Sequence, residues 1–162
     1  MSIRLRRRHR LRKKEIKVLL EQLEGIFLKK FFVVDETLDK AEIGRFDVIL
    51  VNGEILGMSF QDKLFLTVKG LLKYRPEKRF VTVDMGAVKF VYNGADVMAP
   101  GIVDADEDIK KGDLVWVRDE KNMQPLAVGE ALISGKVMIT SNKGKAIKSI
   151  HHVGDDIWNY ES

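Results

Sequence analysis

Glycine and lysine residues recur in two segments of the chain, and their chemistry suits the binding of a polyanion. The first segment, GAVKFVYNGADVMAPGI, runs from Gly86 to Ile102, and the second, KGKAIKSIHHVGDDIW, runs from Lys143 to Trp158. Because glycine has no Cβ atom, a ribose-phosphate backbone can approach its main chain closely, and N–H groups of turns or helix ends can donate to phosphate oxygens. Nearby lysines add positive charge. The two segments therefore indicate binding rather than catalysis.

The residue types that most often carry out catalysis are scarce. The chain has no cysteine, which excludes disulfides, thiol nucleophiles and thiolate metal sites. Of its three histidines, His151 and His152 are neighbours on an expected strand and point to opposite faces, so they cannot hold one ion together. We expect at least one of them to be structural, and metal-dependent catalysis is not expected. Asp155-Asp156 resembles a carboxylate pair, but a polar turn ahead of a core-packed Trp158 is the better interpretation. We find no nucleotide-binding fingerprint or Ser/His/Asp arrangement.

Positive charge is concentrated at the N-terminus. The formal net charge is +4, but residues 1–17 contain nine Lys and Arg residues and one acidic residue. Residues 80–162 contain nine basic and thirteen acidic residues. A solvated tail is one interpretation of the basic run, and contact with nucleic-acid phosphates is the better one. Because the second half is net acidic, it should bind an RNA backbone poorly unless it recognises a particular RNA shape. The basic segment is expected to supply the long-range attraction.

The elements that position these residues begin with a helix. From Leu11 onward the chain has the spacing of an amphipathic helix, which Gly25 is expected to end; its apolar positions are Ile16, Leu19, Leu20 and Leu23. Basic residues occupy the first turns, where the helix macrodipole is already positive. A bound polyanion would relieve that repulsion.

A hairpin and a second helix are predicted next. Phe31–Val34 has the pattern of a short apolar strand. Residues 47–58 predict a hairpin that turns at Asn52-Gly53, because both residues tolerate the positive φ of a type I′ turn. Leu64–Tyr74 is expected to form a helix, and Pro76 is expected to mark its end and a domain boundary.

The second half is predicted to be a small β-barrel. It opens with a strand at Val81–Asp84 and a helical stretch from Gly86 to Tyr92, followed by tight turns at Asn93-Gly94 and Pro100-Gly101. Further strands are expected at Leu114–Val117, Leu126–Ile133, Lys136–Thr140 and Ala146–His151. The predicted fold class is α+β, with a small α/β domain at residues 1–77 followed by a pseudo-barrel of mostly antiparallel strands at residues 78–162.

These motifs resemble a known family. DMGAVKFVYNGADVMAPGI and KGKAIKSIHHVGDDIW closely resemble the PUA domain, a pseudo-barrel that binds structured RNA, over about residues 79–160. VNGEILG followed by LLKYRP is similar in order and spacing to the malignant-T-cell-amplified-sequence family, whose members, like the matching part of ligatin, act in translation initiation and recycling on the small ribosomal subunit. The arginine-rich start and the absence of cysteine differ from the eukaryotic members, and the compact chain resembles an archaeal member.

Carried over residue by residue, the resemblance places RNA against short stretches of the second half. These stretches are Gly86, Ala87 and Lys89; Asn93, Gly94 and Ala95; and Lys143, Gly144 and Lys145, to which Lys148 adds charge. In the basic segment, the expected RNA contacts are Arg4, Arg6, Arg7, Arg8, Arg10, Arg12 and Lys13. Four phenylalanines in apolar runs are expected in the core rather than stacked on bases, namely Phe31, Phe32, Phe80 and Phe90.

The sequence as a whole favours a noncatalytic, cytoplasmic RNA-binding protein of the translation apparatus, without a cofactor. The resemblance implies contacts with tRNA and the small ribosomal subunit, and it allows a partner like density-regulated protein. The alternative is an accessory protein that delivers tRNA or rRNA to a separate modification enzyme. Copurification with such an enzyme would favour that alternative. A third interpretation, an RNA-modifying enzyme, would need turnover that is lost on substitution of Asp84 or His151. No apolar run is long enough to span a membrane.

Overall fold

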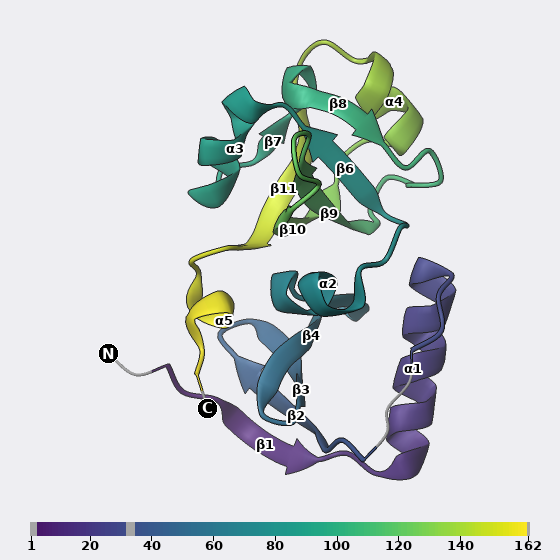
Figure 1. Ribbon diagram of the computed structural model, residues 1–162, viewed down its shortest axis with the longest axis vertical. Helices are drawn as coiled ribbons and strands as arrows, with labels where there is room; N and C mark the ends of the chain where they lie inside the picture. The colour runs from purple at the N-terminus through teal and green to yellow at the C-terminus, as the bar shows by residue number, and fades with distance from the viewer. Residues whose placement is uncertain (1–2, 32–34, 162) are drawn as a thin grey trace. The chain divides into compact units, whose positions relative to one another are not determined.

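The computed structural model describes residues 3–31 and 35–161, which form two compact units (Figure 1). One unit contains the chain up to Pro76 together with the residues from Asp156 onward, and the other contains Glu77–Asp155. The last residues belong with the first unit because Ile157, which is 3% exposed, packs into its core. The predicted division, 1–77 and 78–162, differs from this grouping by one residue at the boundary and in these last residues. Independent folding of the two domains stays a prediction.

The first unit is built on a five-stranded antiparallel sheet in the order β1-β2-β3-β4-β5. Its strands are β1 (Arg6–Arg10), β2 (Leu38–Ile43), β3 (Phe46–Val51), β4 (Glu54–Phe60) and β5 (Lys63–Leu66). The predicted hairpin is confirmed, because β3 and β4 join at Asn52 and Gly53 with φ of 51° and 86°. The basic segment is therefore an edge strand of the sheet rather than a free tail (Figure 1).

Among its described residues the first unit also contains three helices: α1 (Lys13–Phe27), α2 (Val68–Tyr74) and α5 (Asp156–Asn159). The prediction that Gly25 ends the first helix is wrong. The helix continues until Phe27, which is 2% exposed, and ends with Leu28 in the left-handed region at φ 51°. Burial of Phe27 against the ring of Phe65, with ring centroids 4.9 Å apart, stabilises this additional half-turn.

The predicted helix at residues 64–74 is correct only in its second part. Residues up to Leu66 form β5, and α2 starts at Val68, where the side chain of Thr67 accepts a hydrogen bond from the Gly70 N–H. The helix ends with Arg75 in the left-handed region, immediately before Pro76. Of the predicted strand at 31–34, Phe31 is buried, and residues 32–34, with the expected core position of Phe32, lie outside the described residues.

The second unit contains a curled six-stranded sheet in the order β7-β11-β10-β9-β6-β8, in which only the β6–β9 pair is parallel (Figure 1). Its strands are β6 (Phe80–Val83), β7 (Val97–Met98), β8 (Ile102–Ala105), β9 (Leu114–Asp119), β10 (Pro125–Ala131) and β11 (Lys145–His152). Helix α3 (Met85–Tyr92) contacts β10 and β11, and α4 (Gly135–Thr140) contacts β8. The predicted α+β class with mostly antiparallel strands is confirmed.

One predicted strand of this unit is a helix. Lys136–Thr140 lies in α4, because Ser134 accepts a hydrogen bond from the Val137 N–H and so starts a helical turn. Gly135 is buried at the start of this helix, and a Cβ atom there would lie 2.0 Å from the carbonyl oxygen of Asp106. The β-branched residues of KVMIT suggest a strand locally, but this close backbone approach requires the helical turn.

The phenylalanines divide between core and surface. Phe31 is 5% exposed, as predicted. Phe80 is partly exposed and lies under the guanidinium of Arg118, whose Cζ atom is 3.9 Å from the ring centroid. The core prediction for Phe90 is wrong, since its side chain is 57% exposed on α3. In this short helix Val91 faces the barrel core, and the adjacent position therefore faces outward.

Candidate nucleic-acid interface

The chain between α3 and β7 makes a tight turn that lies beside β11. The Gly94 N–H donates to the Val91 carbonyl at 3.0 Å, and the Ala95 N–H donates to the Phe90 carbonyl at 3.0 Å. Gly94 has φ +83°, and a Cβ atom there would lie 2.8 Å from Nε2 of His152. Both the turn and the packing of the imidazole therefore require glycine at this position. The folded structure explains Gly94 without a ligand.

The second glycine segment meets the first along the same edge of the sheet. β7 pairs with β11 so that Met98 lies opposite Lys145, and the Ala99 N–H donates to the Gly144 carbonyl at 2.8 Å. The predicted residues Asn93–Ala95 lie near the end of β11, and Lys143–Lys145 lie at its start. The structure thus brings both predicted stretches to the same edge of the sheet, one stretch near each end of β11.

Asp96 organises the middle of this edge. Its Oδ1 atom accepts the Ser149 N–H at 2.9 Å, and its Oδ2 atom lies 3.3 Å from Nζ of Lys145. The charge of Lys145 is therefore partly compensated. Lys148 lies opposite Glu130 across the β10–β11 pair. Lys143 is exposed and has no ion pair within the described part of the chain, so it is the lysine best placed to attract phosphate. Asp96 is a residue that we did not identify from the sequence.

Near the start of α3, the fold restricts Gly86 much less than it restricts Gly94. Asp84 caps the helix by accepting the Ala87 N–H at 2.9 Å, and Ala87 packs against the turn at Gly101. Gly86 is exposed, its φ is not positive, and the nearest atom to an added Cβ would be Oδ1 of Asp84 at 3.3 Å. A glycine in a helix interior costs about 1 kcal/mol relative to alanine, and this value is an upper limit for Gly86 as the second residue of α3. Close approach of a ligand backbone would explain this residue.

The outer surface of α3 is apolar and aromatic. Phe90, Tyr92 and Met85 are 57%, 40% and 48% exposed. The ammonium group of Lys89 lies 5.2 Å from the Phe90 ring centroid, which places a cation beside an aromatic face. Exposed rings beside positive charge are typical of surfaces that stack on unpaired bases. The helical spacing of Val88 and Val91 toward the core could have identified Phe90 as an outward residue.

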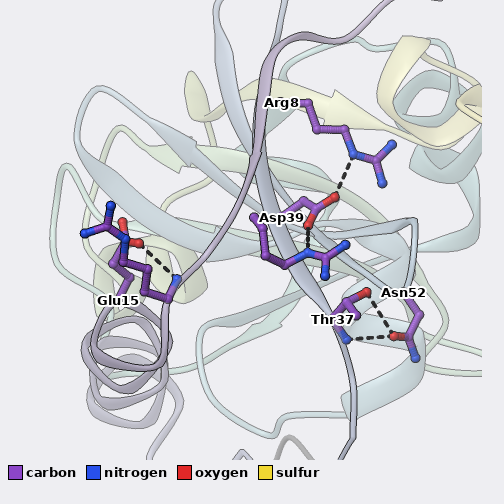
Figure 2. A network of polar contacts seen from close by, with 7 residues as sticks. Arg8, Glu15, Thr37, Asp39 and Asn52 are labelled. Carbon is purple, nitrogen blue, oxygen red and sulfur yellow. Dashed lines mark hydrogen bonds and ion pairs between the residues drawn. The ribbon is translucent and has the colours of Figure 1, made fainter.

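The basic edge strand of the first unit is anchored by one carboxylate. Nε of Arg8 donates to Oδ2 of Asp39 at 2.8 Å, and Nε of Arg10 donates to Oδ1 at 2.6 Å (Figure 2). Burial raises the pKa of Asp39, but the hydrogen bonds from Arg10 and Arg8 outweigh burial and hold it below its ordinary value of 3.8. The hydrogen bond with Asp39 is the main reason that the pKa of Arg8 is raised. Sequence reasoning missed Asp39, because it lies about thirty residues from its partners.

The other predicted arginines of this strand make weaker contacts. Arg6 donates to the Gly44 carbonyl at 2.8 Å, and both Arg6 and Arg7 lie 3.9 Å from Glu42. Exposed ion pairs at this distance contribute little to stability. Arg4 is exposed and precedes the strand. The predicted basic residues that lie in β1 are therefore exposed, but each has an acidic neighbour.

Two further predicted residues lie where β1 turns into α1. The Arg12 N–H donates to Oε1 of Glu15 at 3.0 Å, which satisfies one amide at the start of the helix. Lys13 is the first residue of the helix and is exposed. A hollow on this surface is lined by His9, Arg10, Arg12, Lys13, Lys14 and Glu15. Cationic side chains thus continue from the strand onto the helix.

The described residues contain neither a membrane-spanning helix nor a metal-binding cluster. No helix within residues 3–31 and 35–161 has the length and apolar character needed to cross a membrane. The same described residues contain no group of three or more His, Asp or Glu side chains arranged to hold a metal ion. His151 is fully buried, and its Nδ1 atom lies 2.8 Å from Oδ2 of Asp155, which supports the structural role predicted for one of the two histidines.

Comparisons with known proteins agree with this geometry. A model of the PUA domain matches residues 79–153. An uncharacterized protein of Methanocaldococcus jannaschii is 48% identical over 163 residues, covering 97% of this chain and 98% of that protein. Translation machinery-associated protein 20 of Eremothecium gossypii is 30% identical over 155 residues, covering 88% and 86%.

Further similarity supports the same assignment. Malignant T-cell-amplified sequence 1 of Rattus norvegicus is 30% identical over 120 residues, covering 72% of this chain and 66% of that protein. The crystal structure of a hypothetical protein of Pyrococcus horikoshii is 44% identical, with a TM-score of 0.82 over 93% of this chain and 97% of that one. The predicted resemblance is thereby confirmed. The chain belongs to the family of translation machinery-associated protein 20 and malignant T-cell-amplified sequence, and it carries a PUA domain, an RNA-binding module.

Proposed function

We propose that this protein is a noncatalytic RNA-binding factor of the cytoplasmic translation apparatus, which contacts tRNA and the small ribosomal subunit. The edge formed by β7 and β11, with the adjacent face of α3, is the proposed tRNA-binding surface. Family membership supports translation as the process, since Eremothecium gossypii has a relative named for the translation machinery. The basic edge strand β1 is proposed to contact the phosphates of ribosomal or transfer RNA.

One observation supports this proposal most directly: Gly86 and Lys143 are exposed, and packing within the fold accounts for neither of them fully. Gly86 has no steric neighbour closer than 3.3 Å and no positive φ. Lys143 has no ion pair among the described residues, whereas Lys145 is paired with Asp96 at 3.3 Å. The glycine lies on the helix next to the sheet edge, and the uncompensated lysine lies on the edge itself. Together they suit a phosphate backbone that approaches the main chain closely.

Aromatic exposure gives the proposed surface a means of distinguishing RNA ends from RNA helices. Phe90 is 57% exposed beside Lys89, and it could stack on an unpaired base but not on a base within a duplex. Unpaired bases occur at the ends of tRNA. The proposed surface is therefore expected to prefer tRNA to a blunt RNA duplex.

The test is binding of the full chain to total tRNA and to purified small ribosomal subunits, at two salt concentrations. We expect the double substitution Gly86→Ala with Lys143→Ala to weaken tRNA binding by about tenfold, which corresponds to about 1.4 kcal/mol. Lys121→Ala is the matched control, because Lys121 is an exposed lysine of the same unit outside the surface. Equal affinities of the double variant and the control would contradict the proposal.

The same preparation tests the accessory alternative and the partner. Copurification with an RNA-modification enzyme, without cosedimentation with small subunits, would favour delivery of RNA to that enzyme. A partner like density-regulated protein stays a prediction. Its binding is tested by mixing the purified chain with such a protein and measuring the mass of the complex.

A further inference from the structure

A β-bulge sorts the arginines of β1 onto two faces. Arg6 lies opposite Glu42 and His9 lies opposite Lys40, so two arginines, Arg7 and Arg8, together oppose the one residue between those partners. Arg7 accordingly has φ 52°, in the left-handed region. Without the extra residue, positions 6, 8 and 10 would share a face. The bulge instead leaves Arg8 and Arg10 on the face of Asp39, whereas Arg6 faces Glu42.

Asp39 contacts the two arginines through their Nε atoms, so their terminal nitrogens take no part in these two hydrogen bonds. Each oxygen of its carboxylate accepts from one Nε atom, at 2.8 Å from Arg8 and 2.6 Å from Arg10. Figure 2 shows the terminal nitrogens of Arg8 turned away from Asp39. The Asp39 side chain is 11% exposed, while those of Arg8 and Arg10 are 39% and 63% exposed. A nearly buried carboxylate thus fixes two partly exposed guanidinium groups, of which that of Arg8 also interacts with the side chain of Tyr160.

Fixing an arginine before a ligand arrives reduces the entropy cost of binding. A free arginine side chain loses much of its rotamer freedom when it grips a phosphate, and a guanidinium already held by its Nε loses less. The planar group then offers parallel N–H donors that match two phosphate oxygens. Asp39 lowers the net charge of the site by one but holds two arginines in place. It is therefore expected to favour a fixed arrangement of donors at the expense of long-range attraction.

We propose that Asp39 positions Arg8 and Arg10 as a preformed binding site for the phosphates of an RNA backbone. This inference rests on the proposed function in taking RNA as the ligand. All five residues of β1 are exposed and none is apolar, which disfavours insertion into a membrane surface. A charged edge strand also discourages pairing with a strand of another protein. The hollow that starts at His9 and Arg10 extends the same cationic surface toward α1.

The decisive experiment is Asp39→Asn, because the change in charge and the loss of arginine positioning should change the RNA affinity in opposite directions. The substitution raises the net charge by one, so attraction alone would tighten RNA binding. The proposal expects binding of the full chain to a blunt RNA duplex of about 20 base pairs to weaken by about threefold or more. Glu42→Gln adds the same charge beside Arg6 and Arg7 and is expected to leave binding unchanged or slightly tighter. If both variants bind equally well or more tightly than the parent chain, the proposal is wrong.

A second pair of variants keeps the charge unchanged and tests the proposal even if Asp39→Asn fails to fold. Arg8→Lys with Arg10→Lys keeps the charge but removes the fork geometry, and we expect about tenfold weaker duplex binding. Arg45→Lys with Arg75→Lys is the matched control, because both arginines are exposed in the first unit outside β1, and it should change binding by less than about twofold. Thermal unfolding of every variant shows whether the chain is folded. Equal loss in the two double variants would overturn the positioning role of Asp39.

The outcome is separable from that of the proposed function. The Gly86→Ala and Lys143→Ala variant should lose tRNA binding but keep duplex binding, since its altered residues are not in β1. If that variant loses tRNA binding while the Arg8/Arg10 variant binds the duplex normally, the proposed function stands and this inference fails. Vesicles containing phosphatidylserine are a further probe. Tighter binding to these vesicles than to the duplex would also overturn the inference.

Discussion

The basic edge of the first unit and the glycine-containing edge of the second unit both combine cations with a carboxylate, but they use the carboxylate differently. Asp39 is nearly buried and accepts from two arginine Nε atoms at 2.6 and 2.8 Å. Asp96 is more exposed, accepts one backbone N–H and lies 3.3 Å from a single lysine. The first arrangement orders cations, and the second mainly reduces the charge of one. If the two edges bind phosphate as proposed, an acidic neighbour orders the cations in one case and reduces their charge in the other.

The two edges also differ in what presents the donors. In β1 the exposed donors belong to long side chains, whereas around α3 and β11 the main chain is exposed at Gly86 and Gly144. Side-chain donors tolerate variation in the ligand, while main-chain donors at fixed turns demand a particular shape. We expect RNA binding at the first edge to depend mainly on how the arginine side chains are held. Binding at the second edge should depend mainly on the conformation of the main chain. The following substitutions test that difference.

The largest effect is expected for Gly94→Val in the second unit. A β-branched side chain at φ +83° is strained, and its Cβ would meet the imidazole of His152 at 2.8 Å. We expect the free energy of unfolding to fall by about 3 kcal/mol, measured by urea denaturation. Gly144→Val is the control, since its φ is +85° but nothing lies within 4 Å of the added Cβ. If both variants lose the same stability, packing against His152 does not contribute.

An intermediate effect is expected from comparing two helix glycines. Gly25→Ala in α1 should raise the free energy of unfolding by about 0.5–1 kcal/mol and leave RNA binding unchanged. Gly86→Ala in α3 should change stability less, because its Cβ lies 3.3 Å from Asp84, but should weaken tRNA binding by about fivefold, or about 1 kcal/mol. Filter binding and thermal unfolding measure the two quantities. Unchanged tRNA affinity in Gly86→Ala would remove the main support for close backbone approach.

A smaller effect is expected at the lysines of the second edge. Lys143→Ala should flatten the dependence of log K on log salt for tRNA by roughly 0.7–0.9, the amount for one lost phosphate contact. Lys145→Ala should flatten it less, because Asp96 already compensates Lys145 at 3.3 Å. Binding titrations at four salt concentrations distinguish the two variants. A larger change for Lys145 would mean that RNA displaces Asp96 from that lysine.

The smallest effect concerns the pH dependence of stability in the first unit. The pKa of Asp39 is lowered below its ordinary value of 3.8 by the hydrogen bonds from Arg10 and Arg8, which outweigh burial. Its contribution is therefore fully present above pH 3.8 and is lost as the pH falls through the lowered folded-state pKa. We expect the stability difference between the parent chain and Asp39→Asn to be constant from neutral pH to about pH 5 and to shrink at lower pH. A difference that is instead independent of pH down to pH 2 would show that ionised Asp39 adds no stability.

The basic segment is a structural part of the first unit. Deleting residues 1–14 would remove β1 from its sheet together with Leu11, which is 7% exposed in the core. Any loss of RNA binding in such a truncation would then combine lost charge with lost structure. The substitutions in β1 described above leave the backbone pairing intact and separate the two causes.

Local sequence was sufficient where a short segment decides its own conformation. Asn52-Gly53 predicts its hairpin because both residues accept positive φ, and the structure has φ of 51° and 86° there. Local patterns failed where distant packing decided the result. The helix α1 passes Gly25 because Phe27 is buried, and residues 136–140 form a helix because Gly135 fits against Asp106. In each failure the deciding contact lies far away in sequence.

The amino-acid sequence by itself determined the charge segregation, the absence of cysteine chemistry, and the two motifs of the PUA domain. Only the tertiary structure decided which cations are ordered. Arg8 and Arg10 meet Asp39 about thirty residues later because one bulge shifts the register of β1 against β2. Strand register depends on the pairing of two distant segments, and a single extra residue moves each side chain to the other face. For that reason the carboxylate that arranges the arginines could not be found from local sequence alone.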